Sequence, residues 1–100
     1  MNLEADYKKA LDEVKKIQKK YPEIEKILLF GSRARDDHKY NSDIDLCVFA
    51  PKEFEDKFFT FAGEIEEINT YYSFDVLFWH YLGSDVLKNE ILEDGVKLWK

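Results

Sequence analysis

The chain has 100 residues, of which 45% are hydrophobic and 16% aromatic, and its 21 acidic and 15 basic residues give a formal net charge of −6. We expect residues 1–100 to form a single domain, because this length and apolar content suit one small core. An acidic chain without a dense basic tract disfavours long nucleic acid as a substrate, since that binding depends on Lys and Arg neutralising phosphates.

Cellular location is indicated by cysteine usage and by the apolar stretches. Cys47 is the only cysteine, which excludes a disulfide framework and a thiolate zinc cluster. The apolar stretches are too short to span a bilayer, and the polar N-terminus lacks the apolar core of a signal peptide. We therefore expect a cytoplasmic protein that has no membrane association.

The first part of the chain predicts a helix, a strand and a turn. Apolar residues recur at spacings of three and four over residues 1–21, which indicates an amphipathic helix that Pro22 ends. The apolar run 27–30 predicts a short strand. Residues 32–35 favour the start of a helical turn, whose free N–H groups would face an anion.

A spaced motif follows that first strand. Gly31 and Ser32 close the apolar run, and ten residues later Asp43-Ile44-Asp45 opens a second strand, so the chain spells G-S-x10-D-x-D. Residues two apart share one face of a strand, so both carboxylates point the same way, while the opposite face is apolar. The pattern predicts a strand covered on both faces that enters a site with its acidic end.

The next segments predict a second helix and a third strand. Apolar residues at helical spacing run from Phe54 to Ile68, and residues 73–79 form a β-branched and aromatic run that contains Asp75. A carboxylate in such a run should lie at a strand end, be paired, or bind a metal. Beside Asp43 and Asp45 it would bring three like charges together, which divalent cations neutralise.

The C-terminal segment predicts one more helix and an edge strand. Ser84 is a typical helix cap, Gly95 a typical helix end, and residues 96–99 can add a short strand. Alternating helices and strands indicate an α/β fold with helices packed on a small sheet. Alternation alone favours parallel pairing of the strands.

Three segments together resemble the minimal nucleotidyltransferases, including the antitoxins among them, of the DNA polymerase β superfamily. They are Gly31-Ser32-Arg33-Ala34-Arg35, Ser42-Asp43-Ile44-Asp45-Leu46 and Phe74-Asp75-Val76-Leu77. The resemblance covers residues 24–100, which would be the nucleotidyltransferase core, with 1–21 as an added N-terminal helix. It implies the α+β nucleotidyltransferase fold with a mixed sheet, in place of a parallel one.

The resemblance also implies roles for the motif residues. Asp43 and Asp45 would ligate two Mg²⁺ ions, and Asp75 would ligate the catalytic one and draw the proton from the acceptor hydroxyl. The Gly31 N–H and the Ser32 hydroxyl would hold the β and γ phosphates of ATP. Arg33 or Arg35 would offset the charge of those phosphates, although both are equally typical of solvated surface arginines.

The function implied is transfer of AMP from ATP to a hydroxyl, in which a tyrosine of an all-helical HEPN toxin is the acceptor and this chain is the antitoxin. Two alternatives stay open. One is transfer to a small molecule such as an aminoglycoside, which would need a further substrate domain or a homodimer. The other is a silent module that retains nucleotide or only covers a HEPN protein. A chain this short is expected to borrow surface from a partner or from a second copy.

Other conspicuous residues are assigned ordinary roles. Cys47 is expected in the core, because it has no His or Asp partner typical of a nucleophile. His38 and His80 lack metal-type spacing and receive no role. The aromatics between residues 54 and 61, with Tyr71, Tyr72 and Trp79, are expected in the core. The lysines at 8, 9, 15, 16, 19 and 20 should form the wet face of the first helix.

Overall fold

The computed structural model describes residues 3–31 and 43–98. Its helices and strands are, in chain order, α1 (Leu3–Gln18), β1 (Lys26–Phe30), β2 (Ile44–Phe49), α3 (Glu55–Glu66), β3 (Phe74–Phe78), α4 (Asp85–Asp94) and β4 (Val96–Lys97). Short 3₁₀ turns precede α3 and follow β3. The helical turn expected at residues 32–35 lies outside the described residues.

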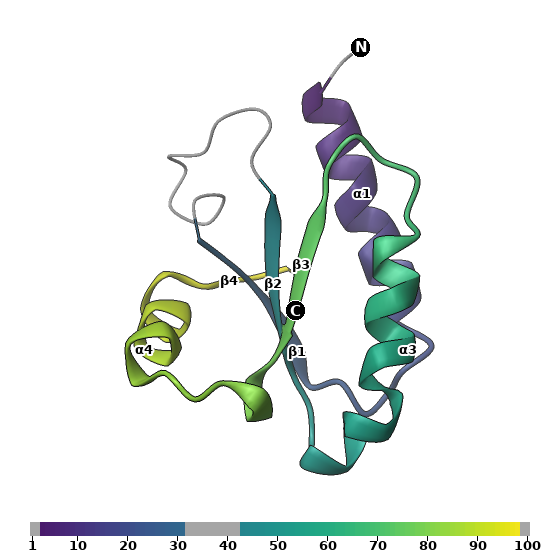
Figure 1. The fold of residues 1–100 in the computed structure, drawn as a ribbon. Coiled ribbons are helices and arrows are strands. Elements are labelled where there is room, and N and C mark those ends of the chain that lie inside the picture. The colour runs from purple at the N-terminus through teal and green to yellow at the C-terminus, as the bar shows by residue number, and fades with distance from the viewer. Residues whose placement is uncertain (1–2, 32–42, 99–100) are drawn as a thin grey trace.

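One mixed sheet organises the molecule. The strand order is β3-β2-β1-β4, in which β1 runs antiparallel to both of its neighbours and β2 runs parallel to β3. Helices α1 and α3 cover one face of this sheet and α4 covers the other (Figure 1). The α/β fold and the mixed sheet implied by the resemblance are confirmed, and the parallel pairing favoured by alternation alone is wrong for β1.

Strand β2 is covered on both faces, as predicted. Ile44, Leu46 and Val48 are buried in the larger core cluster, which α1 and α3 close. Cys47 is buried on the other face, in a smaller cluster beneath α4. Burial raises the pKa of the Cys47 thiol to about 12, so the thiol stays neutral and serves as a small core residue.

The end of the first helix differs from the prediction. Helix α1 ends at Gln18, although Tyr21 belongs to the same apolar stripe. The residue before a proline is restricted away from the helical region, so the chain leaves the helix ahead of Pro22. Tyr21 packs edge-on against Phe61, with ring centroids 5.3 Å apart, and donates a 2.5 Å hydrogen bond to Glu64. That hydrogen bond raises the pKa of Tyr21 to about 12.

Helix α4 begins and ends where the sequence predicted. The Ser84 hydroxyl accepts a 3.2 Å hydrogen bond from the Leu87 N–H, which is the arrangement of an N-cap. At Gly95 a Cβ would collide with the Ile91 carbonyl oxygen and lie 3.0 Å from the Leu28 side chain. The glycine therefore lets the chain pass close to α4 and pair with β1 through the edge strand β4.

The aromatic residues divide between core and surface. Phe54, Phe58 and Phe61 are buried as expected, and the predicted lysines of α1 are exposed. Phe59 is 72% exposed and Tyr71 is 51% exposed, so their assignment to the core was wrong. Residue 59 follows Phe58 by about 100° around the helix, which turns it away from the sheet. Among the described helices, none has the length and apolar character needed to cross a membrane.

Candidate functional site

The strand register brings two of the predicted carboxylates together. Asp45 on β2 is the register partner of Asp75 on β3 and of Phe30 on β1. Neighbouring strands lie about 4.8 Å apart, and register partners in a parallel pair point to the same face. Two acidic side chains from separate strands therefore lie side by side, at the end of the sheet where β1 ends and where β2 and β3 begin (Figure 1).

Asp43 lies one residue before β2, at the same end of the sheet. The Ile44 N–H donates a 2.9 Å hydrogen bond to the Ser73 carbonyl, which ties the start of β2 to the segment that leads into β3. Asp43 and Asp75 are exposed and Asp45 is partly buried. The three predicted carboxylates thus share one end of the sheet, and Asp45 is less exposed than the other two.

The carboxylates do not form a closed cluster. Within residues 3–31 and 43–98, no group of three or more Asp, Glu, His or Cys side chains is placed to hold a metal ion. Like charges repel, so carboxylates that share a site separate until a cation neutralises them. The donors present nevertheless fit Mg²⁺, because paired carboxylate oxygens open to water are the ligands this ion prefers. The predicted convergence is therefore seen in the backbone register and not in a formed three-ligand site.

Gly31 connects the end of β1 to this acidic end of β2. Its φ of +74° lies in the left-handed region, which L side chains rarely adopt. A Cβ at this position would collide with Oδ2 of Asp45. The backbone conformation therefore favours glycine here, and a side chain at this position would also displace the Asp45 carboxylate. The first residue of the predicted phosphate cradle and the first predicted metal ligand of β2 are in contact.

Part of the predicted site lies outside the described residues. Ser32, Arg33 and Arg35 belong to the segment 32–42, as does His38, so their predicted roles stay predictions. His80 lies at the opposite end of β2, where its Nε2 is 2.9 Å from the Ala50 carbonyl oxygen. This contact gives His80 a structural partner and no place near the carboxylates.

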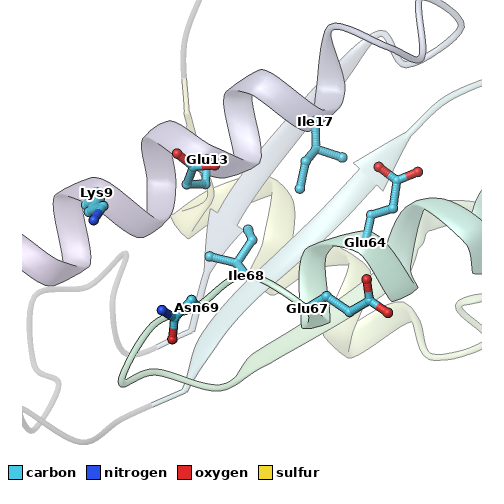
Figure 2. Close-up of a pocket in the computed structure, with 7 residues that line it drawn as sticks. All are labelled: Lys9, Glu13, Ile17, Glu64, Glu67, Ile68 and Asn69. Carbon is cyan, nitrogen blue, oxygen red and sulfur yellow. The ribbon is translucent and has the colours of Figure 1, made fainter.

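A cavity lies on the face of the sheet that α1 and α3 cover. It has a volume of about 310 Å³ and lies between α1 and the end of α3. Figure 2 shows Ile17 and Ile68 facing each other across it. Two of its three acidic residues have basic partners: Lys16 lies 3.2 Å from Glu13, and Lys20 lies 2.5 Å from Glu64. The sequence did not predict this cavity, because it arises from how two distant helices pack. It does not extend the carboxylate site.

Comparison with protein families identifies the class of protein. The family model described as "Polymerase beta, Nucleotidyltransferase" matches residues 12–100. The chain belongs to this nucleotidyltransferase family. The match includes Gly31 and all three carboxylates of the site. Among curated proteins, none gives a significant match.

Solved structures share the fold. A Sulfolobus solfataricus protein assigned as a nucleotidyltransferase is 24% identical, with a TM-score of 0.61 over 98% of this chain and 83% of that one. A toxin-antitoxin structure with AMP-PNP is 23% identical, with a TM-score of 0.61 over 89% of this chain and 72% of that one. A tri-AMPylated Shewanella oneidensis HEPN toxin in complex with MNT antitoxin gives 20% identity and a TM-score of 0.58, over 92% and 71% of the two chains.

Proposed function

We propose that this chain is a Mg²⁺-dependent nucleotidyltransferase that moves AMP from ATP onto a tyrosine hydroxyl of an all-helical HEPN partner, and so acts as an antitoxin in the cytoplasm. The observation that carries the proposal is the pairing of Asp45 with Asp75 against the left-handed turn at Gly31. Membership of the nucleotidyltransferase family supports the reaction class. The AMP-PNP and the AMPylated HEPN toxin of two structural neighbours support ATP and the acceptor.

The nucleotide is held, in this proposal, where β1 meets β2. The Gly31 N–H and the Ser32 hydroxyl hold the β and γ phosphates, and Arg33 or Arg35 offsets their charge. Asp43 and Asp45 hold two Mg²⁺ ions and Asp75 holds one of them. When bound, magnesium supplies neutralisation of the phosphate charge and lowers the pKa of the acceptor hydroxyl. We take residues 24–100 as the catalytic core and residues 1–21 as a helix that supports it.

The chemistry is an in-line displacement at phosphorus. The acceptor oxygen forms a bond to the α-phosphorus, the bond from that phosphorus to the bridging oxygen breaks, and pyrophosphate leaves. Asp75 is the residue best placed to take the acceptor proton, because it is exposed and lies on the edge strand β3. Asp45 is partly buried on the central strand β2, which suits a ligand held in fixed geometry.

Transfer of label from ATP tests this function. The chain is incubated with α-labelled ATP, Mg²⁺ and the helical protein encoded in the adjacent reading frame. Replacement of both Asp43 and Asp45 by Asn should lower labelling by at least about a thousandfold, because both ions lose their ligands. The matched control combines Asp12→Asn on α1 with Glu93→Gln on α4, which removes the same two charges from exposed positions, and it should label normally.

Three outcomes would count against the proposal. A complex that forms without label would favour the silent binding module. Unaltered labelling by the double variant would remove the metal assignment. Labelling of a small hydroxylated compound such as an aminoglycoside, with none on protein, would favour the small-molecule alternative.

A further inference from the structure

The outer side of α3 carries an exposed aromatic residue that the core does not use. Phe59 is 72% exposed, whereas Phe58 and Phe61 of the same helix are buried. Its ring lies 5.5 Å from that of Phe58 and 6.3 Å from that of Tyr81, which is itself 49% exposed. Large apolar side chains that gather at the surface mark sites of contact with other molecules.

Gly63 lies four residues further along α3 and so faces the same side of the helix. A glycine inside a helix costs stability relative to alanine. Apart from its chain neighbours and the backbone of α3 itself, no atom of the described residues lies within 4 Å of the position that a Cβ on Gly63 would take. Nothing in the described fold therefore requires this glycine. Its effect is a shallow spot beside Phe59 where a foreign backbone can approach closely.

Acidic residues surround this pair. At helical spacing around Phe59 and Gly63 stand four exposed carboxylates: Glu55, Asp56, Glu66 and Glu67. The basic residue of this helix, Lys57, instead pairs with Glu23 on the segment after α1. A second copy of the chain would bring four further carboxylates against these and adds its own net charge of −6. Charge complementarity therefore favours a basic occupant.

We propose that the outer face of α3, made of Phe59, Gly63 and the four surrounding carboxylates, docks a basic amphipathic helix of the partner protein. Identifying that partner as the HEPN acceptor rests on the proposed function. A helix fits because residues four apart form the ridge and groove along which helices pack. Phe59 enters the partner's groove, the partner's ridge crosses α3 at Gly63, and its Lys or Arg side chains meet the carboxylates.

The location of this surface agrees with such a role. Helix α3 covers the sheet face opposite to α4 (Figure 1). Asp45 lies two residues before Cys47 on β2, so by alternation its side chain is on the α4 face with Cys47. Docking on α3 thus does not cover the end of the sheet where Gly31 and Asp45 lie. It also leaves the β3 edge, where Asp75 is exposed, open to the acceptor hydroxyl.

Calorimetry without nucleotide tests the docking surface. The chain is titrated with the proteins encoded in the two flanking reading frames, and the dissociation constant is measured. Phe59→Asp and Gly63→Leu should each weaken the complex by at least about tenfold. The matched controls lie on α4: Val86→Asp, at a 79% exposed position, and Asn89→Leu, at an exposed position, should change the constant by less than about twofold.

Thermal melting of the isolated chain separates docking from folding. Gly63→Leu should raise the melting temperature by about 4 °C, because leucine is a better helix former and finds open space there. A variant that is more stable alone and yet binds its partner less tightly has lost a contact surface and not its fold.

Several results would overturn the docking surface. In the first, the unaltered chain binds neither flanking protein. In the second, both α3 variants and both controls bind the partner with equal affinity. In the third, the chain alone forms a dimer that depends on Phe59. A Phe59-dependent complex in which no label passes from ATP would uphold the docking surface and refute the transfer. Labelling that persists with equal affinity of all variants would uphold the transfer and refute the docking surface.

Discussion

The two faces of the sheet differ in how they are covered. The face beneath α1 and α3 carries the larger apolar cluster, in which aromatic rings from α3 and β3 stack, as between Phe58 and Phe78 with centroids 5.1 Å apart. The face beneath α4 holds a smaller buried cluster of Leu28, Phe30, Cys47 and Ile91. Asp45 projects from this second face, beyond the end of that cluster.

The difference teaches why the carboxylates are where they are. A thick apolar layer over Asp45 would remove water from its charge and raise its pKa, which would weaken its affinity for a cation. Among the described residues, one short helix covers the far part of the face, and the acidic end lies beyond it. We infer that most of the folding free energy resides on the α1 and α3 face, and that the chemistry resides on the other.

The largest expected effect is a loss of stability on the face of the sheet beneath α1 and α3. Phe61 is fully buried and packs against Phe54 and Tyr21, so Phe61→Ala should cost about 3–5 kcal/mol in the free energy of unfolding. That is a large part of the stability of a typical domain. Urea unfolding followed by circular dichroism measures it. Leu87→Ala, at a partly buried position on α4 that packs against the smaller cluster, should cost clearly less, and equal losses would contradict the division.

Alkaline pH should lower the free energy of unfolding through Cys47, which is buried on the face beneath α4. The pKa of the buried thiol is raised from 9.0 to about 12, so folding opposes its ionisation. This contribution to stability is fully present below pH 9.0 and is lost as the pH rises towards about 12, by at most about 1.4 kcal/mol per pH unit. Unfolding free energies of the native chain and of Cys47→Ala, measured between pH 8 and 11, should therefore converge as the pH rises.

The face beneath α1 and α3 also has a group that titrates at alkaline pH, Tyr21, which serves as the control. Tyr21 has its pKa raised from 10.0 to about 12, first by its hydrogen bond to Glu64, so its contribution is lost above pH 10.0. Tyr21→Phe removes this group and leaves Cys47 in place. Curves for the native chain and Cys47→Ala that stay parallel between pH 9 and 10 would show that the thiol does not oppose ionisation.

Alternation within a strand was enough to predict which residues share a face. It placed Asp45 with Cys47 on one side of β2, because this pattern depends only on neighbours in sequence. The strand that contains Asp75 was predicted from its β-branched and aromatic residues. The register that pairs Asp45 with Asp75 involves segments thirty residues apart, and no local pattern encodes it. The mixed character of the sheet was predicted from the family resemblance and not from alternation, and neither predicted which strand is antiparallel.

Side-chain exposure on α3 was harder to predict than the helix itself. The apolar stripe predicted the helix, but a run of phenylalanines gave no sign that Phe59 leaves the core. The partners of Tyr21 beyond the end of α1, Phe61 and Glu64 on α3, are likewise tertiary contacts that the apolar stripe did not predict. The collision that forbids a side chain at Gly31 required the position of Asp45, which again belongs to the folded chain.

An intermediate effect is expected where β1 meets the site. Gly31→Ala forces a side chain into a left-handed backbone at about 1–2 kcal/mol and displaces the Asp45 carboxylate. A ligand moved by about 1 Å can lower the rate of transfer about a hundredfold. Labelling assays together with thermal melts measure both losses. Gly83→Ala is the control, because a Cβ there meets no described atom within 4 Å, and a Gly31→Ala enzyme of normal activity would separate this turn from catalysis.

The smallest expected effect tests whether α4 can be destabilised without a loss of transfer activity. Ser84→Ala removes the hydroxyl that accepts from the Leu87 N–H and should cost about 1 kcal/mol. Ser84→Asp keeps an acceptor and adds a favourable negative charge at the helix N-terminus, so it should restore the loss. The hydrogen bond of this cap involves neither Gly31 nor Asp45. Under conditions in which the chain is folded, labelling by Ser84→Ala should therefore fall by less than about twofold. A larger fall that Ser84→Asp rescues would mean that α4 positions the carboxylates, and that stability and chemistry are not divided between the faces.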